Sequence, residues 1–460
     1  MAVVLIAGAI LPLFRNSTSA TATAEPTQAV TPTFPPPITD FSNISLDQVY
    51  LHPGGLFAVS QPTGWDSVSP NSNSGQAGAN MVNTTQQSVI DVSVQPSNGI
   101  TTAGLSDYFT QGVLRQSWAN FSNWTETNRR MEGDRLLIDF VVTYQSQQYV
   151  ARQISYTDGD WIYNTRVLAP NNAADVITYM MSVLPDRFIP FKQFLNTPFE
   201  WLGYYDAQYR TIIRYPSNWT LADEAPGRLA SITGANGEAL RLTNVSGQTI
   251  ADETAAAAYA QSVRPNITVL STEAVTHGDL SGFSVAYTFS NVDGEPQSGA
   301  MVLLNDEGAL HTADLYFPAR NVDLNTVQTV PEQIAEQAAA AAEATPEATG
   351  EVADAFGSVA TSVSPTIDTT QQTYAAYATI LATFSRLPVL NLSPQSLPAT
   401  PTPIPTVAPP TIVVPEITLE VTAEATVEAT TVPTEAAVEA TVEATADATA
   451  EATAEATAAQ

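Results

Sequence analysis

The chain has 460 residues, a formal net charge of −30 and no cysteine, which excludes disulfides, thiolate metal sites and cysteine nucleophiles. Lys and Arg together number only 16, and this argues against nucleic acid or an anionic membrane face as a partner, because both reward clustered basic side chains. The acidity is concentrated at the end, where ten carboxylates and no basic residue follow Pro401.

The chain begins with an apolar run over residues 2–14, which is short for a bilayer crossing and has the length of a signal-peptide core. Small residues at 20–24 follow as candidate cleavage sites. No basic residue precedes the run, so either the start lacks a basic leader or the segment remains as an anchor. We expect an extracytoplasmic protein, secreted or anchored to the outer face of the cytoplasmic membrane, that meets the membrane only through this segment.

A nine-residue pattern occurs twice, 154 residues apart. Phe57–Trp65 reads as an extended apolar run, a Pro, a two-residue turn and a Trp, and Thr211–Trp219 repeats the same order. The Pro ends a paired strand, and the Trp is large enough to anchor a core. The chain is therefore expected to contain two copies of one fold.

The first copy continues with alternating and amphipathic segments. Residues 87–94 alternate as a half-buried strand, and residues 105–118 carry apolar side chains at the three- and four-residue spacing of a helix. Three strands at 124–131, 135–144 and 149–156 precede a hairpin at Gly159. A strand at 161–168 and a helix at 173–184 complete the copy.

The second copy follows the same order. Strands are expected at 238–245, 280–289, 301–304 and 310–317, with a helix at 251–263 and a closing helix at 370–387. An Ala/Glu/Thr-rich stretch separates Pro318 from that closing helix, and we interpret it as a low-complexity insertion on a surface loop.

The segments define a domain plan with two folded units and several attachments. The aromatic connector is expected to bury the seam between the units, and the repetitive tail is expected to be disordered, because it has no apolar face to bury. The plan is a signal peptide or anchor at 1–24, a linker at 25–46, domain 1 at 47–190, the connector at 191–209, domain 2 at 210–390 with its insertion at 331–365, and the tail at 391–460.

Few residues point to chemistry. No phosphate-binding loop, zinc-binding His-Glu-x-x-His, nucleophile elbow or dinucleotide fingerprint is present. The three histidines are far apart in sequence, and we expect them in exposed loops or at strand edges. We predict no cofactor, no metal site and no catalytic residue, and the sequence favours a noncatalytic protein over an enzyme.

Six residues are candidates for contact with a ligand. Asp139 and Arg152 lie in neighbouring apolar strands, where a cross-strand ion pair on the solvent face is favoured over a polar patch in a cleft. The second copy has Ser284 where Asp139 aligns. The aromatic candidates are Trp118, Trp124, Trp161 and, in the connector, Trp201. They could form a stacking platform for sugars or peptides, but a role as core anchors is favoured.

The order strand, Pro-x-Gly/Asn-Trp, strand, helix, meander and closing helix resembles the PsbP superfamily, named for an extrinsic subunit of photosystem II. The residues that carry the resemblance are Phe57–Trp65, Ile212–Trp219 and the helices that end at Leu184 and Leu387. It implies an α+β fold with two tandem α/β/α sandwich domains, each a mainly antiparallel sheet with flanking helices. It also implies binding or scaffolding roles, and no functional residue carries over.

We therefore expect a noncatalytic binding or scaffolding protein of the cell envelope, whose partner is an envelope protein or polysaccharide. Two alternatives remain open. One is an envelope glycan-binding protein that uses the aromatic connector, and the other is a hydrolase whose site is assembled from distant positions.

Overall fold

A computed structural model describes residues 34–394, except residue 35, residues 69–71, residue 74, residues 223–228 and residues 344–368. The expected signal or anchor segment and the tail beyond residue 394 lie outside the described residues. Within the described part of the chain, no helix combines the length and the apolar character needed to cross a membrane.

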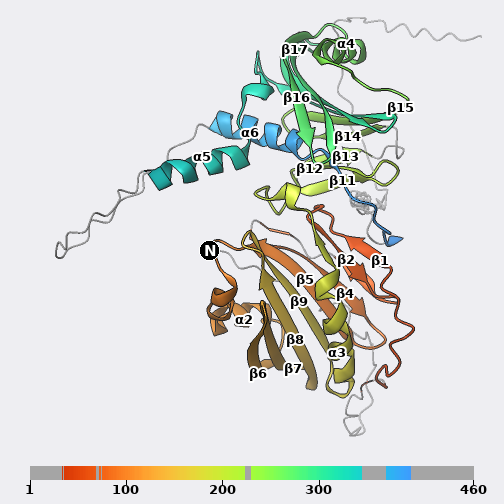
Figure 1. The fold of residues 1–460 in the computed structure, drawn as a ribbon, viewed down its shortest axis with the longest axis vertical. Helices are drawn as coiled ribbons and strands as arrows, with labels where there is room; N and C mark the ends of the chain where they lie inside the picture. Colours follow the sequence, from red (N-terminus) through yellow and green to blue (C-terminus); the bar gives the residue numbers. More distant parts are fainter. Residues whose placement is uncertain are drawn as a thin grey trace, which may run out of the picture. The chain divides into compact units, whose positions relative to one another are not determined.

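The first repeat contains a seven-stranded antiparallel sheet and a three-stranded antiparallel sheet (Figure 1). The large sheet has the order β3-β4-β5-β9-β8-β7-β6, and the small sheet has the order β1-β2-β10. The strands are β1 (Gln48–Leu51), β2 (Phe57–Gln61), β3 (Asp66–Val68), β4 (Ala77–Asn83), β5 (Ser88–Pro96), β6 (Asn123–Glu132), β7 (Arg135–Tyr144), β8 (Gln147–Thr157), β9 (Trp161–Pro170) and β10 (Phe188–Pro190).

Helices cover both faces of the first large sheet. On one face lies α3 (Ala174–Val183), which buries Val176, Ile177 and Met180 against the sheet. The other face is covered by α1 (Leu105–Tyr108) and α2 (Gln111–Ser117). The expectation of one helix over 105–118 was wrong, because Thr110 starts a new helix by accepting a hydrogen bond from the Val113 N–H at its Oγ1, 3.3 Å away.

Because helices cover both faces of this sheet, β5 is buried on both sides. The expectation of a half-buried strand at 87–94 was therefore wrong.

The second repeat has the same two sheets. The large one runs β13-β14-β15-β19-β18-β17-β16, and the small one runs β11-β12-β20. The strands are β11 (Leu202–Asp206), β12 (Thr211–Tyr215), β13 (Thr220–Ala222), β14 (Leu229–Thr233), β15 (Ala239–Ser246), β16 (Thr268–His277), β17 (Leu280–Ser290), β18 (Pro296–Asp306), β19 (Ala309–Pro318) and β20 (Ser385–Arg386).

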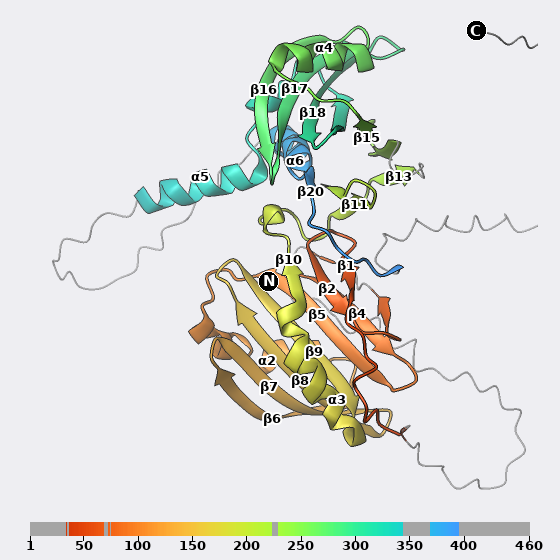
Figure 2. The same ribbon diagram turned by 45° about the vertical axis from the view of Figure 1, so that its right-hand side comes forward.

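One face of the second large sheet is covered by α4 (Glu253–Val263), as Figure 2 shows, and the other by α6 (Thr369–Ala382). The side chain of Asp252 caps α4 by accepting a hydrogen bond from the Ala255 N–H at 2.8 Å. Each repeat is thus a mixed α+β unit with an antiparallel sheet between helices, which confirms the expected fold class.

The Pro-to-Trp turn has the same geometry in both repeats. The Trp65 N–H donates to the Pro62 carbonyl at 3.2 Å, and the Trp219 N–H donates to the Pro216 carbonyl at 3.0 Å. Both indole rings are buried, with exposed fractions of 2% and 7%. The turn therefore returns the chain to the core at equivalent positions, as the repeated sequence predicts.

Of the insertion expected at 331–365, residues 331–343 are helical, and residues 344–365 lie outside the described residues. The segment before the insertion contains the short turn η7 (Leu324–Thr326), which packs on the second large sheet. The chain continues as α5 (Val330–Glu343), which lies beside α6 in Figures 1 and 2. Pro331 is compatible with this helix because its position in the first turn needs no N–H partner.

Candidate functional site

The predicted pair of Asp139 and Arg152 is a cross-strand ion pair. The two residues face each other on β7 and β8, with 2.6 Å between the Arg152 Nε and the Asp139 Oδ1, and Arg130 adds a contact at 3.0 Å. Their side chains are 21% and 27% exposed. Burial acts to raise the pKa of Asp139, but the two guanidinium groups outweigh it and lower that pKa.

The four tryptophans do not share a surface. Trp118 packs under α2 on one face of the sheet, near Trp124 and Phe140, whereas Trp161 is buried on the opposite face. Trp201 is 7% exposed and belongs to the core of the second repeat. No common stacking platform results, so the structure favours the core-anchoring interpretation for Trp118, Trp161 and Trp201.

The connector is also largely buried. Five of its aromatic rings have exposed fractions below 9%, namely Phe191, Phe194, Phe199, Trp201 and Tyr205. Beside them lies the fully buried Arg214, whose guanidinium donates to the Gly54 carbonyl at 2.7 Å, the Pro198 carbonyl at 2.7 Å and the Thr197 hydroxyl. Burial lowers the pKa of Arg214 to about 9. A glycan site formed by this connector is therefore not supported.

The first repeat also contains a buried ion pair that the sequence pattern did not reveal. Asp91 on β5 faces Arg166 on β9, with 2.5 Å between the Asp91 Oδ2 and the Arg166 Nη2, and the Trp118 ring lies 4.3 Å from the guanidinium. The Asp91 Oδ1 and the Trp118 Nε1 are buried without a hydrogen-bond partner among the described residues. Burial raises the pKa of Asp91 despite the attraction of Arg166.

The second repeat has a buried pair at the same sheet position, with the charges reversed. Asp314 on β19 occupies the position that Arg166 occupies on β9 of the first repeat. Its carboxylate accepts a hydrogen bond from Arg264 at 2.6 Å. Arg264 is the C-terminal cap of α4, and its guanidinium lies 4.1 Å from the Tyr316 ring. The Tyr287 hydroxyl also donates to Asp314. These groups outweigh the opposing effect of burial and raise the pKa of Arg264.

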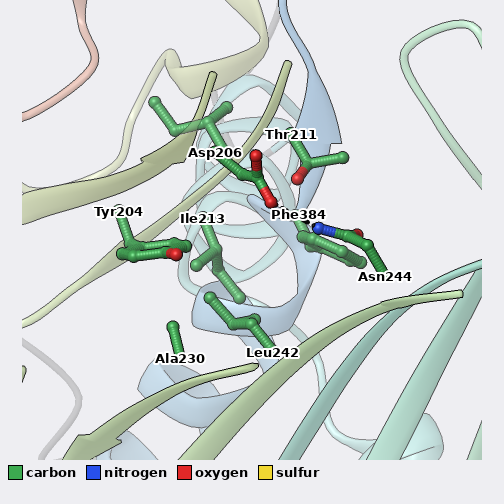
Figure 3. A pocket seen from close by; sticks show the side chains of 9 residues that line it. Tyr204, Asp206, Thr211, Ile213, Ala230, Leu242, Asn244 and Phe384 are labelled. Carbon is green, nitrogen blue, oxygen red and sulfur yellow. Dashed lines mark hydrogen bonds between the residues drawn. The ribbon is translucent and has the colours of Figure 1, made fainter. Parts of the chain in front are cut away.

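An array of polar and titratable groups begins at Asp206 and Asn244, which line the pocket of Figure 3. The Asp206 Oδ2 accepts from the Asn244 Nδ2 at 2.6 Å, and the Asn244 Oδ1 lies 2.8 Å from the His311 Nδ1. The other ring nitrogen of His311 lies 3.3 Å from the Asp306 Oδ2, and Arg386 contacts the same carboxylate. This array joins residues far apart in sequence.

The array is closed to substrate. His311 has an exposed fraction of 0%, and burial lowers its pKa although Asp306 opposes this effect. The Asn244 side chain donates to Asp206, so its Oδ1 faces the His311 Nδ1, while the His311 Nε2 faces the Asp306 carboxylate. The pocket itself holds about 10 Å³, the space of one water molecule. His52 and His311 are buried, against the expectation of exposed loops or strand edges, whereas His277 is half-buried at the end of the edge strand β16.

An open groove lies at the end of the second large sheet. It has a volume of about 360 Å³ and lies between the end of β19, the β14–β15 turn and the start of α6. Its lining combines aromatic, carboxylate, amide and hydroxyl side chains: Phe317, Tyr374, Tyr377, Glu238, Asn236 and Thr373. Because it is open and polar on one side, this groove is the candidate functional site.

Hydrogen bonds hold the carboxylate of the groove in place. The Glu238 Oε1 accepts from the Tyr377 hydroxyl at 2.8 Å and from the Asn236 Nδ2 at 3.2 Å, and its Oε2 accepts from the Asn236 N–H at 2.8 Å. Burial acts to raise the pKa of Glu238, but these bonds outweigh it and lower that pKa. Glu238 is only 6% exposed, so its carboxylate holds the β14–β15 turn and α6 together at the wall of the groove.

None of the six predicted contact residues lines the groove. The sequence contained one signal for it, the long insertion after Pro318, which separates the end of a strand from the helix that would otherwise cover it. Among the described residues, no group of three or more His, Asp or Glu side chains is arranged to hold a metal ion.

No protein-family model matches the chain, and no curated protein matches it. Solved structures are similar at low identity. The cyanobacterial PsbP protein (CyanoP) of Synechocystis sp. PCC 6803 is 16% identical, with a TM-score of 0.22, over 25% of this chain and 79% of that chain. The type VI secretion immunity protein TplEi of Pseudomonas aeruginosa is 11% identical, with a TM-score of 0.17, over 60% and 90%.

The Tle4–Tli4 complex is 11% identical, with a TM-score of 0.20, over 77% of this chain and 100% of that chain. The likeness to CyanoP is thus distant and covers a quarter of the chain. At these values the similarities give no information on function.

Proposed function

We propose that this chain is a noncatalytic binding or assembly module of the cell envelope, built from two PsbP-like domains at 47–190 and 210–390. The open groove at the end of β19 carries the proposal, because it offers a partner a concave, partly polar surface. The partner is an envelope protein or polysaccharide, and neither nucleic acid nor a cofactor is required.

The arrangement of the titratable side chains supports binding rather than catalysis. General acid–base chemistry requires a titratable group within hydrogen-bond reach of the substrate. His311 is fully buried, and Asp91 and Asp314 are each paired with an arginine inside the core. These groups are placed to stabilise the fold, and a hydrolase is the less supported alternative.

The proposed location is extracytoplasmic and rests on the apolar segment at 2–14, which has the length of a signal-peptide core. N-terminal sequencing of the protein recovered from cell fractions tests it. We expect the protein in an envelope or secreted fraction, either cleaved near residue 24 or retained as an anchored chain. An intact protein confined to the cytoplasm would contradict the proposed location.

To test the binding function, the purified full chain is immobilised and incubated with an envelope extract from the source cells. Proteins and sugars that remain after washing are identified by mass spectrometry and by compositional analysis. We expect one protein or polysaccharide to be retained well above a column of heat-unfolded chain. A column that retains nothing specific, with and without added calcium, would contradict the function.

A further inference from the structure

A small cavity lies under the end of α2 in the first repeat. Its volume of about 10 Å³ is the space of one water molecule. Strands β5 and β9 contribute Val89, Asp91, Arg166 and Leu168 to its lining, and Trp118 lines it from the end of α2. The cavity therefore adjoins the buried ion pair of this repeat.

Two of the lining residues have unused hydrogen-bond capacity. The Asp91 Oδ2 accepts from Arg166, but the Asp91 Oδ1 and the Trp118 Nε1 have no hydrogen-bond partner among the described residues. The two residues are 6% and 2% exposed, so bulk water does not reach these atoms freely. Because a buried polar atom without a partner destabilises the fold, one acceptor and one donor at this cavity need a further group.

Asn80 adds a third side chain to this set. It lies directly opposite Asp91 on the neighbouring strand β4, so the two side chains project from the same face of the sheet. Asn80 has an exposed fraction of 0%, and neither its Oδ1 nor its Nδ2 has a hydrogen-bond partner among the described residues. Donors and acceptors without partners are thus gathered on one side of the ion pair.

This combination selects the chemistry of the occupant. A metal cation or an ammonium ion cannot accept a hydrogen bond from the Trp118 indole. An anion such as chloride could accept that bond, but it would lie against the Asp91 carboxylate. A neutral molecule that both donates and accepts satisfies both atoms, and the volume of the cavity limits such a molecule to the size of water.

The second repeat meets the same need with a hydroxyl group. Both oxygens of the Asp314 carboxylate have partners, since Oδ2 accepts from Arg264 and Oδ1 accepts from the Tyr287 hydroxyl. In the register of the strands, Tyr287 on β17 corresponds to Phe140 on β7. Phe140 has no hydroxyl, so the first repeat has no equivalent donor for its own buried carboxylate.

We propose that the cavity between α2, β5 and β9 binds a single water molecule, which donates to the Asp91 Oδ1 and accepts from the Trp118 Nε1. A water molecule has one further donor and one further acceptor position, and these suit the neighbouring amide of Asn80. The bound water belongs to the core of the first repeat and takes the part that the Tyr287 hydroxyl has in the second. It is independent of the groove and of the proposed envelope partner.

The test is nuclear magnetic resonance on the full chain, labelled with nitrogen-15 at its six tryptophan indoles. Trp118→Phe identifies the Trp118 signal by its loss. Contacts of that signal to the ring of Phe140, whose centroid lies 5.1 Å away, identify it independently if the variant does not fold. In the wild type, the Trp118 N–H should give a cross-peak to water with opposite signs in laboratory-frame and rotating-frame Overhauser spectra, because the water remains bound while the protein tumbles.

The matched control is Trp124→Phe, which removes a half-buried indole that does not line the cavity. This variant should lose its own indole signal and keep the cross-peak between Trp118 and water.

Three results would overturn the proposal. If the Trp118 N–H shows no cross-peak to water in the folded chain, the cavity is dry. A cross-peak with the same sign in both spectra would report exchange of the indole proton with the solvent instead of a bound water. If the Trp118 signal shifts when chloride in the buffer is replaced by bromide, the occupant is an anion.

Discussion

The two repeats diverge where the last strand of each large sheet ends. In the first repeat, β9 ends at Pro170 and the chain enters the closing helix α3 within a few residues. In the second, β19 ends at Pro318, and η7 and α5 intervene before the closing helix α6 packs on the sheet. In the second repeat, the groove lies between the end of β19 and the start of α6.

The sheet surface is also covered differently in the two repeats. In the register of the strands, Asp139 and Arg152 of the first repeat correspond to Ala286 and Ala300 of the second. The turn η7 packs beside these alanines, which are fully buried, whereas the first repeat leaves its ion pair partly exposed. This register also corrects the alignment of Asp139 with Ser284. At equivalent sheet positions, the first repeat thus has a partly exposed ion pair and the second has buried alanines.

At one pair of equivalent positions, different side chains close the loop that follows the first strand of each small sheet. The loop after β1 is closed by His52, whose Nδ1 accepts from the Gly54 N–H at 3.0 Å. The loop after β11 is closed by Asp206, whose Oδ1 accepts from the Gln208 N–H at 2.8 Å. Both side chains accept from the residue two positions later. Both side chains are titratable, and each has an exposed fraction of 2%.

The strongest test of the comparison removes the buried arginines. Arg166→Ala leaves the Asp91 carboxylate with no hydrogen-bond partner, and Arg264→Ala leaves Asp314 with the Tyr287 hydroxyl. Breaking a buried pair costs about 3–5 kcal/mol, so we expect Arg166→Ala near the upper figure and Arg264→Ala near the lower. Urea unfolding followed by tryptophan fluorescence measures both.

The matched control for this test is the double variant Asp91→Leu with Arg166→Met. It should recover most of the loss, because an apolar pair of similar volume often replaces a buried ion pair without cost. Losses below about 1 kcal/mol in both single variants would show that these pairs do not stabilise the two folds.

The next effect concerns pH. Burial, followed by the charge of Arg214, lowers the pKa of His52 to about 3, while the Ser72 hydroxyl lies 3.1 Å from its Nε2. The folded state keeps the ring neutral where the unfolded state protonates it, so stability falls as the pH drops below about 6.5. Between pH 6.5 and 4.5 the loss should approach about 2.7 kcal/mol.

The variant His52→Asn isolates this contribution, since His277 and His311 also have lowered pKa values. The amide oxygen can accept from the Gly54 N–H, as Asp206 does in its own loop. Thermal unfolding from pH 7 to pH 4.5 should depend less steeply on pH in this variant than in the wild type. If the variant and the wild type lose stability equally steeply with falling pH, His52 does not cause the pH dependence.

The smallest expected effect belongs to the exposed pair. Arg152→Ala should lower the free energy of unfolding by about 0.2–1 kcal/mol, because partly exposed pairs are screened by water and Asp139 keeps Arg130. Urea unfolding at low and high salt measures the change, which should shrink as salt rises. A loss as large as that of Arg166→Ala would contradict the distinction between exposed and buried pairs.

Local patterns predicted most of the elements. The hairpin at Gly159, the helix over 251–263 and the long middle strands were found, because turn residues and periodicity are read over a few positions. The strand β16 was missed, and β18 was predicted too short, because the segments that form them lack a clean alternation of apolar and polar residues. The cross-strand pair of Asp139 and Arg152 was found because neighbouring strands share a register.

The candidate groove could not be found in this way. Glu238, Phe317 and Tyr377 lie in three elements, and only the packing of α6 against the end of the sheet brings them together. The buried pairs raise the same difficulty, since Arg264 reaches Asp314 from a helix on another layer.

The sequence by itself determined the duplication, the alternation of strands and helices and the Pro-to-Trp turn, because each depends on residues that are close along the chain. The tertiary structure alone decided which polar side chains were buried, which charges met and where a groove remained open. Those outcomes depend on which layers cover each face of a sheet, and such contacts join residues separated by 50 to 139 positions.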